Sequence, residues 1–360
     1  MPAALTMRDT PDLIAQGKTG ASNPLAATQE QTMICDTVAR FFSDNLEDSA
    51  LGRGPLASGH WQELAALGLL AVILPERAGG LGGSPRDAAL IAEEFGRALA
   101  ISPLADSVVA AAGLVAKYGD ESVVERWVTS VLDGRECLAW APGRIEIQAG
   151  GRLSGELPLV RWAEQAAALL VPLGKAVHLV PTGAPGVVMQ ARRLVDGTPT
   201  ATVTLDGVRT IAIAVPAGAI RQAEAEAQLC HVAEMVGAMA LLHRETADYT
   251  QQRSQFGAAI GTFQAVQHKL ARMFVLLEQA RSSLLRASLC DREDPEFVRA
   301  LTSAKAFVAE AAVRLAEDAV QLHGGIGITD ELVVGRGLRR IAVLARLFGT
   351  AEDARAQLFK

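Results

Sequence analysis

The chain has 360 residues, of which 50% are hydrophobic and only 4% are aromatic, and its formal net charge is −6. This length is enough for two or three domains. A core poor in aromatic rings must be packed by aliphatic side chains, which suits helices better than aromatic-rich sandwiches. The negative charge argues against a general nucleic-acid binder, because such proteins present a basic face.

The cysteines and the start of the chain bear on its compartment. Cys35, Cys137, Cys230 and Cys290 are far apart and none belongs to a C-x-x-C pair. We therefore expect free thiols in a reducing cytoplasm, with neither a disulfide framework nor a metal site. Residues 1–27 show no basic segment followed by an apolar one, so we expect a flexible tail without a secretory signal. No apolar run is long enough to cross a membrane. The sequence predicts a cytoplasmic protein that binds neither nucleic acid nor membrane.

Hydrophobic periodicity divides the rest of the chain into three parts. Over residues 28–135 the apolar residues recur at helical spacing, which predicts an N-terminal helical domain. Residues 136–217 are broken by Gly and Pro into short runs with β-branched residues, which predict a small, shortened middle β-domain. Over residues 218–360 the stripes are long and predict a C-terminal four-helix bundle that also assembles with other subunits. Its expected helices are Ala225–Gln251, Thr262–Leu289, Pro295–Leu322 and about Ile341–Phe359. The expected fold class is α+β, mainly α.

Three segments could carry chemistry. The first, Gly79-Gly80-Leu81-Gly82-Gly83-Ser84, lacks both the P-loop lysine and the G-x-G-x-x-G spacing. A structural turn, with Ser84 capping the next helix, is therefore favoured over a phosphate cradle.

The second segment is Arg253-Ser254-Gln255-Phe256-Gly257, followed by Ile260-Gly261-Thr262-Phe263-Gln264. A break between two long helices exposes N–H groups beside a guanidinium, which suits a diphosphate. A plain helix–helix corner fits these residues equally well.

The third segment is Gln321-Leu322-His323-Gly324-Gly325-Ile326-Gly327. Its glycines allow close approach to a flat ligand. Taken alone, a glycine helix stop with a satisfied histidine explains it better. No H-E-x-x-H, G-x-S-x-G or Walker motif is present.

Together these segments resemble the acyl-CoA dehydrogenase family over nearly the whole chain after the tail. The α–β–α order is similar, and Leu74-Pro75-Glu76 with the glycine-rich loop resembles the family's N-terminal domain. Arg253 to Gly257 with Phe263-Gln264 resembles its R-x-x-F-G…Q segment, and Gln321 to Gly327 resembles its Q-x-x-G-G-x-G segment. Two ordered motifs at family spacing are a specific signal.

The resemblance implies roles toward a neighbouring subunit. In the family both C-terminal segments reach across an interface to the ADP half of a FAD whose flavin lies in the neighbour. Carried over by position, Arg253 would pair with the diphosphate, with Phe256, Phe263 and Gln264 around it. The adenosine end would be lined by Gln321, Leu322, His323, Gly324 and Gly325.

The chain departs from the family pattern at the residues that would contact its own flavin and supply its own catalytic base. The family's T-E-P-x-x-G-S-D motif is represented by Trp140-Ala141-Pro142-Gly143-Arg144, without Thr, Ser or acid, and its W-x-[ST] strand by Trp162-Ala163-Glu164. The two positions at which members carry the catalytic glutamate are Phe348 and Ala227 here. Neither side chain accepts a proton, so no catalytic residue is assigned to this chain. Substitution by Glu226, Glu224 or Glu234 is the less favoured alternative.

This pattern resembles the degenerate, α-type subunit of actinobacterial heteromers that degrade steroid side chains. We therefore expect one subunit of an α2β2 FAD-dependent acyl-CoA dehydrogenase. A homologous partner would supply the base, a CoA thioester would be the substrate, and an electron-transfer flavoprotein would accept the electrons. The alternatives are a homotetramer with a displaced base such as Glu226, and a flavin-free scaffold.

Overall fold

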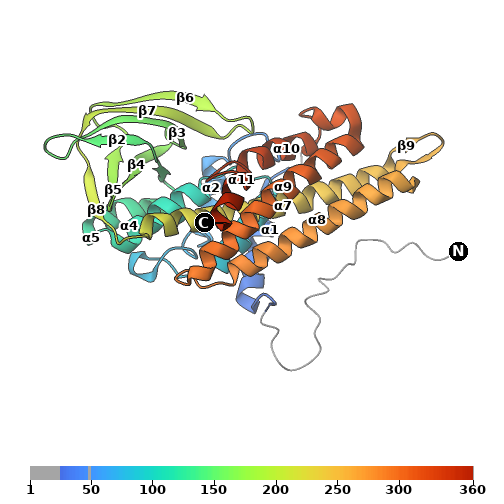
Figure 1. Ribbon diagram of the computed structural model, residues 1–360, viewed down its shortest axis with the longest axis horizontal. Coiled ribbons are helices and arrows are strands. Elements are labelled where there is room, and N and C mark those ends of the chain that lie inside the picture. Colours follow the sequence, from blue (N-terminus) through green and yellow to red (C-terminus); the bar gives the residue numbers. More distant parts are fainter. Residues whose placement is uncertain (1–24, 48–49, 360) are drawn as a thin grey trace.

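The computed structural model describes residues 25–47 and 50–359. Residues 1–24 of the tail expected over residues 1–27 lie outside the described part. The β-sheet region lies at one end of an elongated body of helices, and the β9–β10 hairpin at the other (Figure 1). This arrangement is the expected mainly helical α+β fold.

The N-terminal part is helical, and two of its helices begin at capping boxes. Thr28 caps α1 together with Gln31, and Ser84 caps α3 together with Asp87; both side chains satisfy backbone N–H groups that a helix start leaves free. The elements are α1 (Gln29–Asn45), α2 (Ser58–Ala66), η2 (Glu76–Ala78), α3 (Pro85–Arg97), η3 (Leu104–Ala112), α4 (Gly113–Tyr118), α5 (Glu121–Val123), η4 (Val124–Val128) and α6 (Thr129–Leu132).

The middle part is built from two four-stranded sheets, ordered β1-β4-β5-β8 and β2-β3-β7-β6. All neighbouring strands are antiparallel except β1 and β4. Alternate residues of β7, among them Val203, are buried in the hydrophobic core of this part, together with Leu157 of β3. The strands are β1 (Cys137–Trp140), β2 (Arg144–Ile147), β3 (Leu153–Arg161), β4 (Ala166–Leu173), β5 (Ala176–Pro181), β6 (Val187–Arg193), β7 (Pro199–Val208) and β8 (Ile211–Ala214).

The C-terminal part returns to helices. Its elements are α7 (Ala219–Gln252), β9 (Ser254–Gln255), β10 (Ala258–Ala259), η5 (Ile260–Thr262), α8 (Gln264–Ser288), α9 (Pro295–His323), η6 (Gly324–Ile328), α10 (Val333–Leu344) and α11 (Ala351–Leu358). The single helix expected over Ile341–Phe359 is wrong. The chain turns between α10 and α11 at Phe348 and Gly349, whose φ angles are 55° and 101°.

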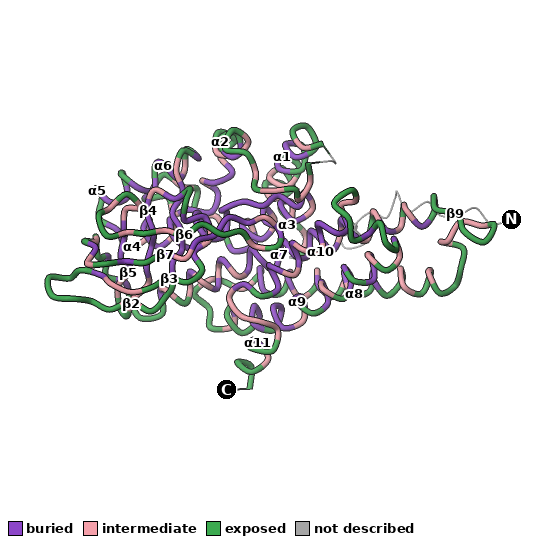
Figure 2. Tube along the Cα trace, turned by 90° about the horizontal axis from the view of Figure 1, so that it is seen from above, coloured by how far each residue is buried: buried purple, intermediate pink, exposed green. Residues whose placement is uncertain are grey.

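Helix α7 is the centre of the helical core, and it is buried along most of its length (Figure 2). It approaches α3 closely because glycines face the contact from both sides. A Cβ atom at Gly96 would lie 2.1 Å from the Glu234 carbonyl oxygen, and one at Gly237 would lie 1.9 Å from that of Glu93. Only glycine allows this separation, which fixes α7 against the N-terminal part.

Candidate functional site

The glycine-rich loop between η2 and α3 has a structural role. A Cβ at Gly80 would lie 2.0 Å from the Leu74 carbonyl oxygen, and one at Gly83 would lie 2.4 Å from that of Val72. The loop therefore packs backbone against backbone. Ser84 caps α3 as expected, and the box it forms with Asp87 uses the N–H groups that a phosphate would need.

The Arg253 segment forms a β-hairpin at the end of the molecule. Strands β9 and β10 pair through Ser254 with Ala259 and Gln255 with Ala258. Phe256 and Gly257 form the tip with φ angles of 53° and 81°, the two positive values that a two-residue type I′ turn requires. Phe256 is 93% exposed, and its ring meets Phe263 edge to face at 6.3 Å between centroids.

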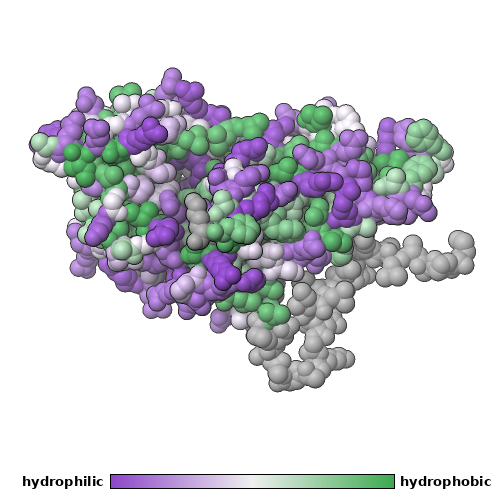
Figure 3. All heavy atoms as spheres, viewed as in Figure 1, coloured by the Kyte–Doolittle hydropathy of each residue, from purple (hydrophilic) through white to green (hydrophobic). Residues whose placement is uncertain are grey.

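Polar side chains around this hairpin are available to a second molecule. The Arg253 guanidinium is exposed and forms no ion pair with any described residue, and the Gln264 amide is also exposed and unpaired within the described chain. This end of the molecule carries both hydrophobic and hydrophilic surface (Figure 3). A cationic, amide-bearing, partly aromatic surface can take a phosphate group next to an aromatic ring system.

The Gln321 segment ends α9 close to the Arg253 segment. His323 is buried, donates a hydrogen bond of 2.8 Å from Nδ1–H to the Ala319 carbonyl oxygen, and stacks on Tyr249 with 4.1 Å between centroids. Tyr249 lies one turn before Arg253, so this stack connects the two segments. Gln321, Gly324 and Gly325 are exposed, and no atom lies within 4 Å of a Cβ built at either glycine.

The β-domain of this chain has few side chains placed to hydrogen-bond a flavin. The Trp140 indole is buried in the helical core, and no hydroxyl or carboxyl side chain follows it before Arg144. Trp162 is buried with a φ of 65°, while Glu164 is exposed. The residues present do not fit the hydrogen-bonding pattern that the family uses for the flavin.

Phe348, one of the two positions expected for the catalytic base, contacts α7 close to Ala227, the other expected position. Gln228, next to Ala227, donates a hydrogen bond of 3.0 Å from Nε2 to the Phe348 carbonyl oxygen. His231, one turn further along α7 than Ala227, places its ring 5.5 Å from the Phe348 ring. Ala227 itself is completely buried.

A buried ion pair between the β region and the N-terminal helical region lies beside Phe348. Arg161, at the end of β3, donates to both carboxylate oxygens of Asp106 on η3, with 2.7 Å from Nε to Oδ2. The side chains are only 12% and 4% exposed. The guanidinium carbon of Arg161 also lies 5.6 Å from the centre of the Phe348 ring. The geometry is that of a bidentate pair with a cation–π contact.

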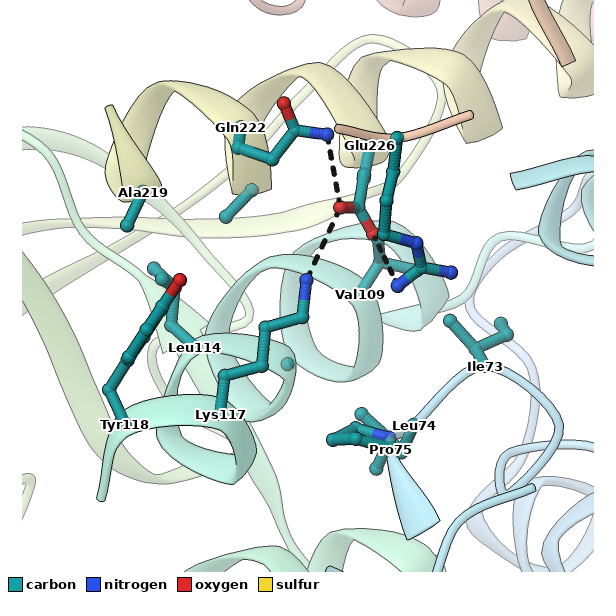
Figure 4. Close-up of a pocket in the computed structure, with 13 residues that line it drawn as sticks. Ile73, Leu74, Pro75, Val109, Leu114, Lys117, Tyr118, Ala219, Gln222 and Glu226 are labelled. Atoms are coloured by element: carbon teal, nitrogen blue, oxygen red, sulfur yellow. Dashed lines mark hydrogen bonds and ion pairs between the residues drawn. The ribbon is translucent and has the colours of Figure 1, made fainter. Parts of the chain in front are cut away.

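Two of the glutamates considered as substitute bases, Glu226 and Glu234, are held by cationic side chains. Glu226 lies beside a small cavity of about 20 Å³, which has room for one or two waters but not for an acyl chain. Its carboxylate is held by Gln222 at 3.2 Å, Lys117 at 3.5 Å and Arg292 at 3.6 Å (Figure 4).

Glu234 and Glu224 differ in their surroundings. Glu234 is buried and paired with Arg340 at 2.5 Å, and burial raises the pKa of its carboxyl despite that partner. Burial also raises the pKa of Glu224, which the nearby Trp140 indole partly offsets, although Trp140 Nε1 has no hydrogen bond of normal geometry.

Within the described residues no group of three or more His, Cys, Asp or Glu side chains is arranged to hold a metal ion. Nor does any helix in that part of the chain combine the length and apolar character needed to cross a membrane.

Comparison with known proteins identifies the family. The model of the acyl-CoA dehydrogenase N-terminal domain matches residues 28–135, and that of the C-terminal domain matches residues 217–360. The acyl-CoA dehydrogenase FadE27 of Mycobacterium tuberculosis is 30% identical over 305 residues, which cover 77% of this chain and 80% of FadE27. The chain belongs to the acyl-CoA dehydrogenase family. Members of this family are FAD-dependent oxidoreductases.

Solved structures of the family share the fold. A chain in a variant of the Tcur3481-Tcur3483 steroid ACAD superimposes with a TM-score of 0.81 at 28% identity, covering 92% of this chain and 96% of that one. A chain in the ChsE4-ChsE5 complex from M. tuberculosis gives a TM-score of 0.83 at 24% identity, covering 93% and 97%. The expected fold class is thereby confirmed.

Sequence reasoning missed the buried charged residues. Asp106, Arg161 and Arg340 belong to no recognisable motif. The signal was weak: an acid inside a buried helix needs a partner, but the partner lies 55 residues away in sequence.

Proposed function

We propose that this chain is the non-catalytic, α-type subunit of a heteromeric FAD-dependent acyl-CoA dehydrogenase. One observation carries the proposal: Phe348 and Ala227 stand at the two expected base positions, neither side chain accepts a proton, and Phe348 lies against the buried Arg161–Asp106 ion pair. The segments that would serve a neighbour, around Arg253 and Gln321, lie exposed at the other end. Resemblance to chains of the steroid ACAD and of the ChsE4-ChsE5 complex supports a partner that is a homologous subunit, in an α2β2 assembly.

The reaction would be the α,β-desaturation of a CoA thioester, with a steroid side chain as the favoured acyl group. In the complex, a carboxylate of the partner subunit takes the α proton. FAD bound in the complex would supply the oxidant for the β hydride, and an electron-transfer flavoprotein would receive the electrons. This chain's Arg253 would pair with the diphosphate, Phe256, Phe263 and Gln264 would surround it, and residues 321–325 would line the adenosine end.

The test uses the chain co-expressed with a homologue that retains the flavin motif and a base. Arg253→Ala is expected to lower the FAD content of the complex and to raise the concentration of FAD needed to restore activity. Arg244→Ala is the matched control, because Arg244 lies on α7, the helix that Arg253 follows, is exposed and pairs with its neighbour Glu245.

Other outcomes would support the competing functions. Unchanged FAD content and activity in the Arg253→Ala complex would favour a flavin-free scaffold. Acyl-CoA turnover by the purified single chain, abolished by Glu226→Gln, would favour a homotetramer with a displaced base.

A further inference from the structure

A cleft of about 530 Å³ lies where the starts of α1 and α3 meet the end of α8 and the loop that follows it. Its size falls within the range of pockets that hold small organic molecules. No residue of the Arg253 or Gln321 segments lines it, so the cleft is separate from the surface assigned to the cofactor. Its polar lining includes Thr28, Gln31, Ser84, Arg86, Asp291 and Arg292.

Arg86, in the first turn of α3, is a buried cation at the wall of this cleft. The residue is only 9% exposed. Its Nη2 donates a hydrogen bond of 2.9 Å to the Leu25 carbonyl oxygen, and because the next residue, Ala26, lines the cleft, this bond places the guanidinium at its wall. Nε and Nη1 are buried and have no hydrogen-bonding partner. The guanidinium forms no ion pair with any described residue.

The acidic side chains beside the cleft are used by other groups. Asp87 accepts hydrogen bonds from the Ser84 N–H and hydroxyl through Oδ2, both at 2.7 Å, and from the Gln31 amide through Oδ1 at 2.9 Å. Asp291 accepts from the Glu293 N–H at 3.2 Å. Burial lowers the pKa of Arg86, and the charge of Asp87 only partly offsets this effect. The positive charge of Arg86 is therefore unbalanced within the described part of the chain.

Other buried arginines of this chain are paired with carboxylates. Arg161 is held by Asp106, and Arg340 by Asp196 and Glu234. A buried charge without a counter-ion is costly, and so is a buried N–H group without an acceptor. An anion bound in the cleft beside Arg86 would remove both costs.

We propose that this cleft is a binding site for a small organic molecule that carries a phosphate or carboxylate group, and that Arg86 recognises this group. A guanidinium can donate parallel N–H hydrogen bonds to either kind of oxyanion. The capping box already uses backbone N–H groups at the start of α3, so recognition falls on the side chain. Arg292 adds positive charge to the same cleft, which Glu226 balances only in part from 3.6 Å. The site does not depend on the role proposed for the chain in FAD binding.

The test uses the purified full chain, titrated with inorganic phosphate and, separately, with acetate at constant ionic strength. The Nε–H signals of the arginines are followed by NMR, and the Arg86 signal is assigned by its loss in Arg86→Lys, which keeps the positive charge. This signal is expected to shift and to saturate with at least one of the two anions. A response to phosphate alone identifies a phosphate group as the ligand, and a response to acetate identifies a carboxylate.

Thermal unfolding gives a second readout. A ligand that binds only the folded state raises Tm saturably, so phosphate or acetate should raise the Tm of the wild type more than that of Arg86→Met. Phosphate also stabilises proteins through exclusion from their surface, and this general effect should be equal in both proteins. Without either anion, Arg86→Met should be as stable as the wild type or more stable, because the unbalanced buried charge is gone.

Arg77→Met is the matched control. Arg77 also donates to carbonyl oxygens, those of Lys117 and Gly119, but it is exposed and lies outside the cleft. Its variant should keep the full response to the anion. An Arg86 signal that saturates with neither anion, or a Tm response that is the same in Arg86→Met as in the wild type, would overturn the proposal and leave Arg86 as a structural tie to Leu25.

Discussion

Arg340 holds two buried carboxylates that belong to different parts of the chain. Its guanidinium donates to Asp196, in the turn between β6 and β7, at 2.9 Å and to Glu234 of α7 at 2.5 Å. All three side chains are at most 6% exposed. Replacing Arg340 by Met keeps most of the volume but leaves two buried negative charges without a cationic partner, although Asp196 keeps its hydrogen bonds from Thr198.

Breaking a buried pair in this way costs about 3–5 kcal/mol. The unfolding entropy of globular proteins, roughly 2 cal/mol/K per residue, gives about 0.7–0.8 kcal/mol/K for a chain of this length. The Tm of Arg340→Met should therefore fall by about 4–7 °C at pH 7. Differential scanning calorimetry measures this shift, with Arg346→Met as the control because Arg346 is exposed and bonds only to the Ala342 carbonyl oxygen.

The pH dependence of the difference gives a second check. Burial already raises the pKa of Glu234 in the wild type, and loss of the Arg340 charge raises it further. A carboxyl with a raised pKa destabilises the folded state as pH increases and it ionises. The deficit of the variant should therefore shrink as pH falls into the range where the carboxyls protonate. A loss below about 1 kcal/mol, or a deficit that grows on acidification, would refute this account of the cluster.

Three further predictions concern single residues. Burial lowers the pKa of Lys305 to about 8. Between that pH and the ordinary lysine value the unfolded chain therefore binds more protons than the folded chain, and the stability of the fold rises with pH. Lys305→Met should lack this rise when Tm is compared at the two ends of the window. Gly237→Ala should lower the free energy of unfolding by about 2 kcal/mol or more, because its Cβ would meet the Glu93 carbonyl oxygen. Gly59→Ala on α2, where nothing lies within 4 Å of the added Cβ, should raise the free energy of unfolding by up to about 1 kcal/mol. Urea unfolding measures both changes. Phe256→Gly should leave the stability of the isolated chain unchanged or slightly higher, since the ring is exposed at a positive φ. The same change should weaken association with the flavin-bearing partner in sedimentation experiments. Equal association of variant and wild type would contradict the role given to the hairpin.

Local signals predicted the order of helical and β regions and the three long C-terminal helices. Apolar periodicity marks the long helices, and Ser84 with Asp87 is a readable helix start. The break between α10 and α11 was missed because Phe348 carries a left-handed φ without being a glycine. That conformation depends on Gln228, 120 residues away in sequence, and no local pattern encodes it.

The same limit applies to the candidate site. Motif spacing singled out Arg253 and Gln321, but the stack of Tyr249 on His323 that connects their segments is a tertiary contact. The sequence alone shows that Phe348 and Ala227 stand where an acid is expected. That the Arg161–Asp106 ion pair lies beside Phe348 is a tertiary contact between β3 and η3.

The most direct test of the central claim is the FAD content of the purified proteins. The chain alone should be colourless, and its complex with a flavin-bearing homologue should be yellow, with about one FAD for each pair of unlike subunits. Absorbance spectra combined with quantitative amino-acid analysis give this ratio. A full FAD per chain in the lone protein would contradict the account.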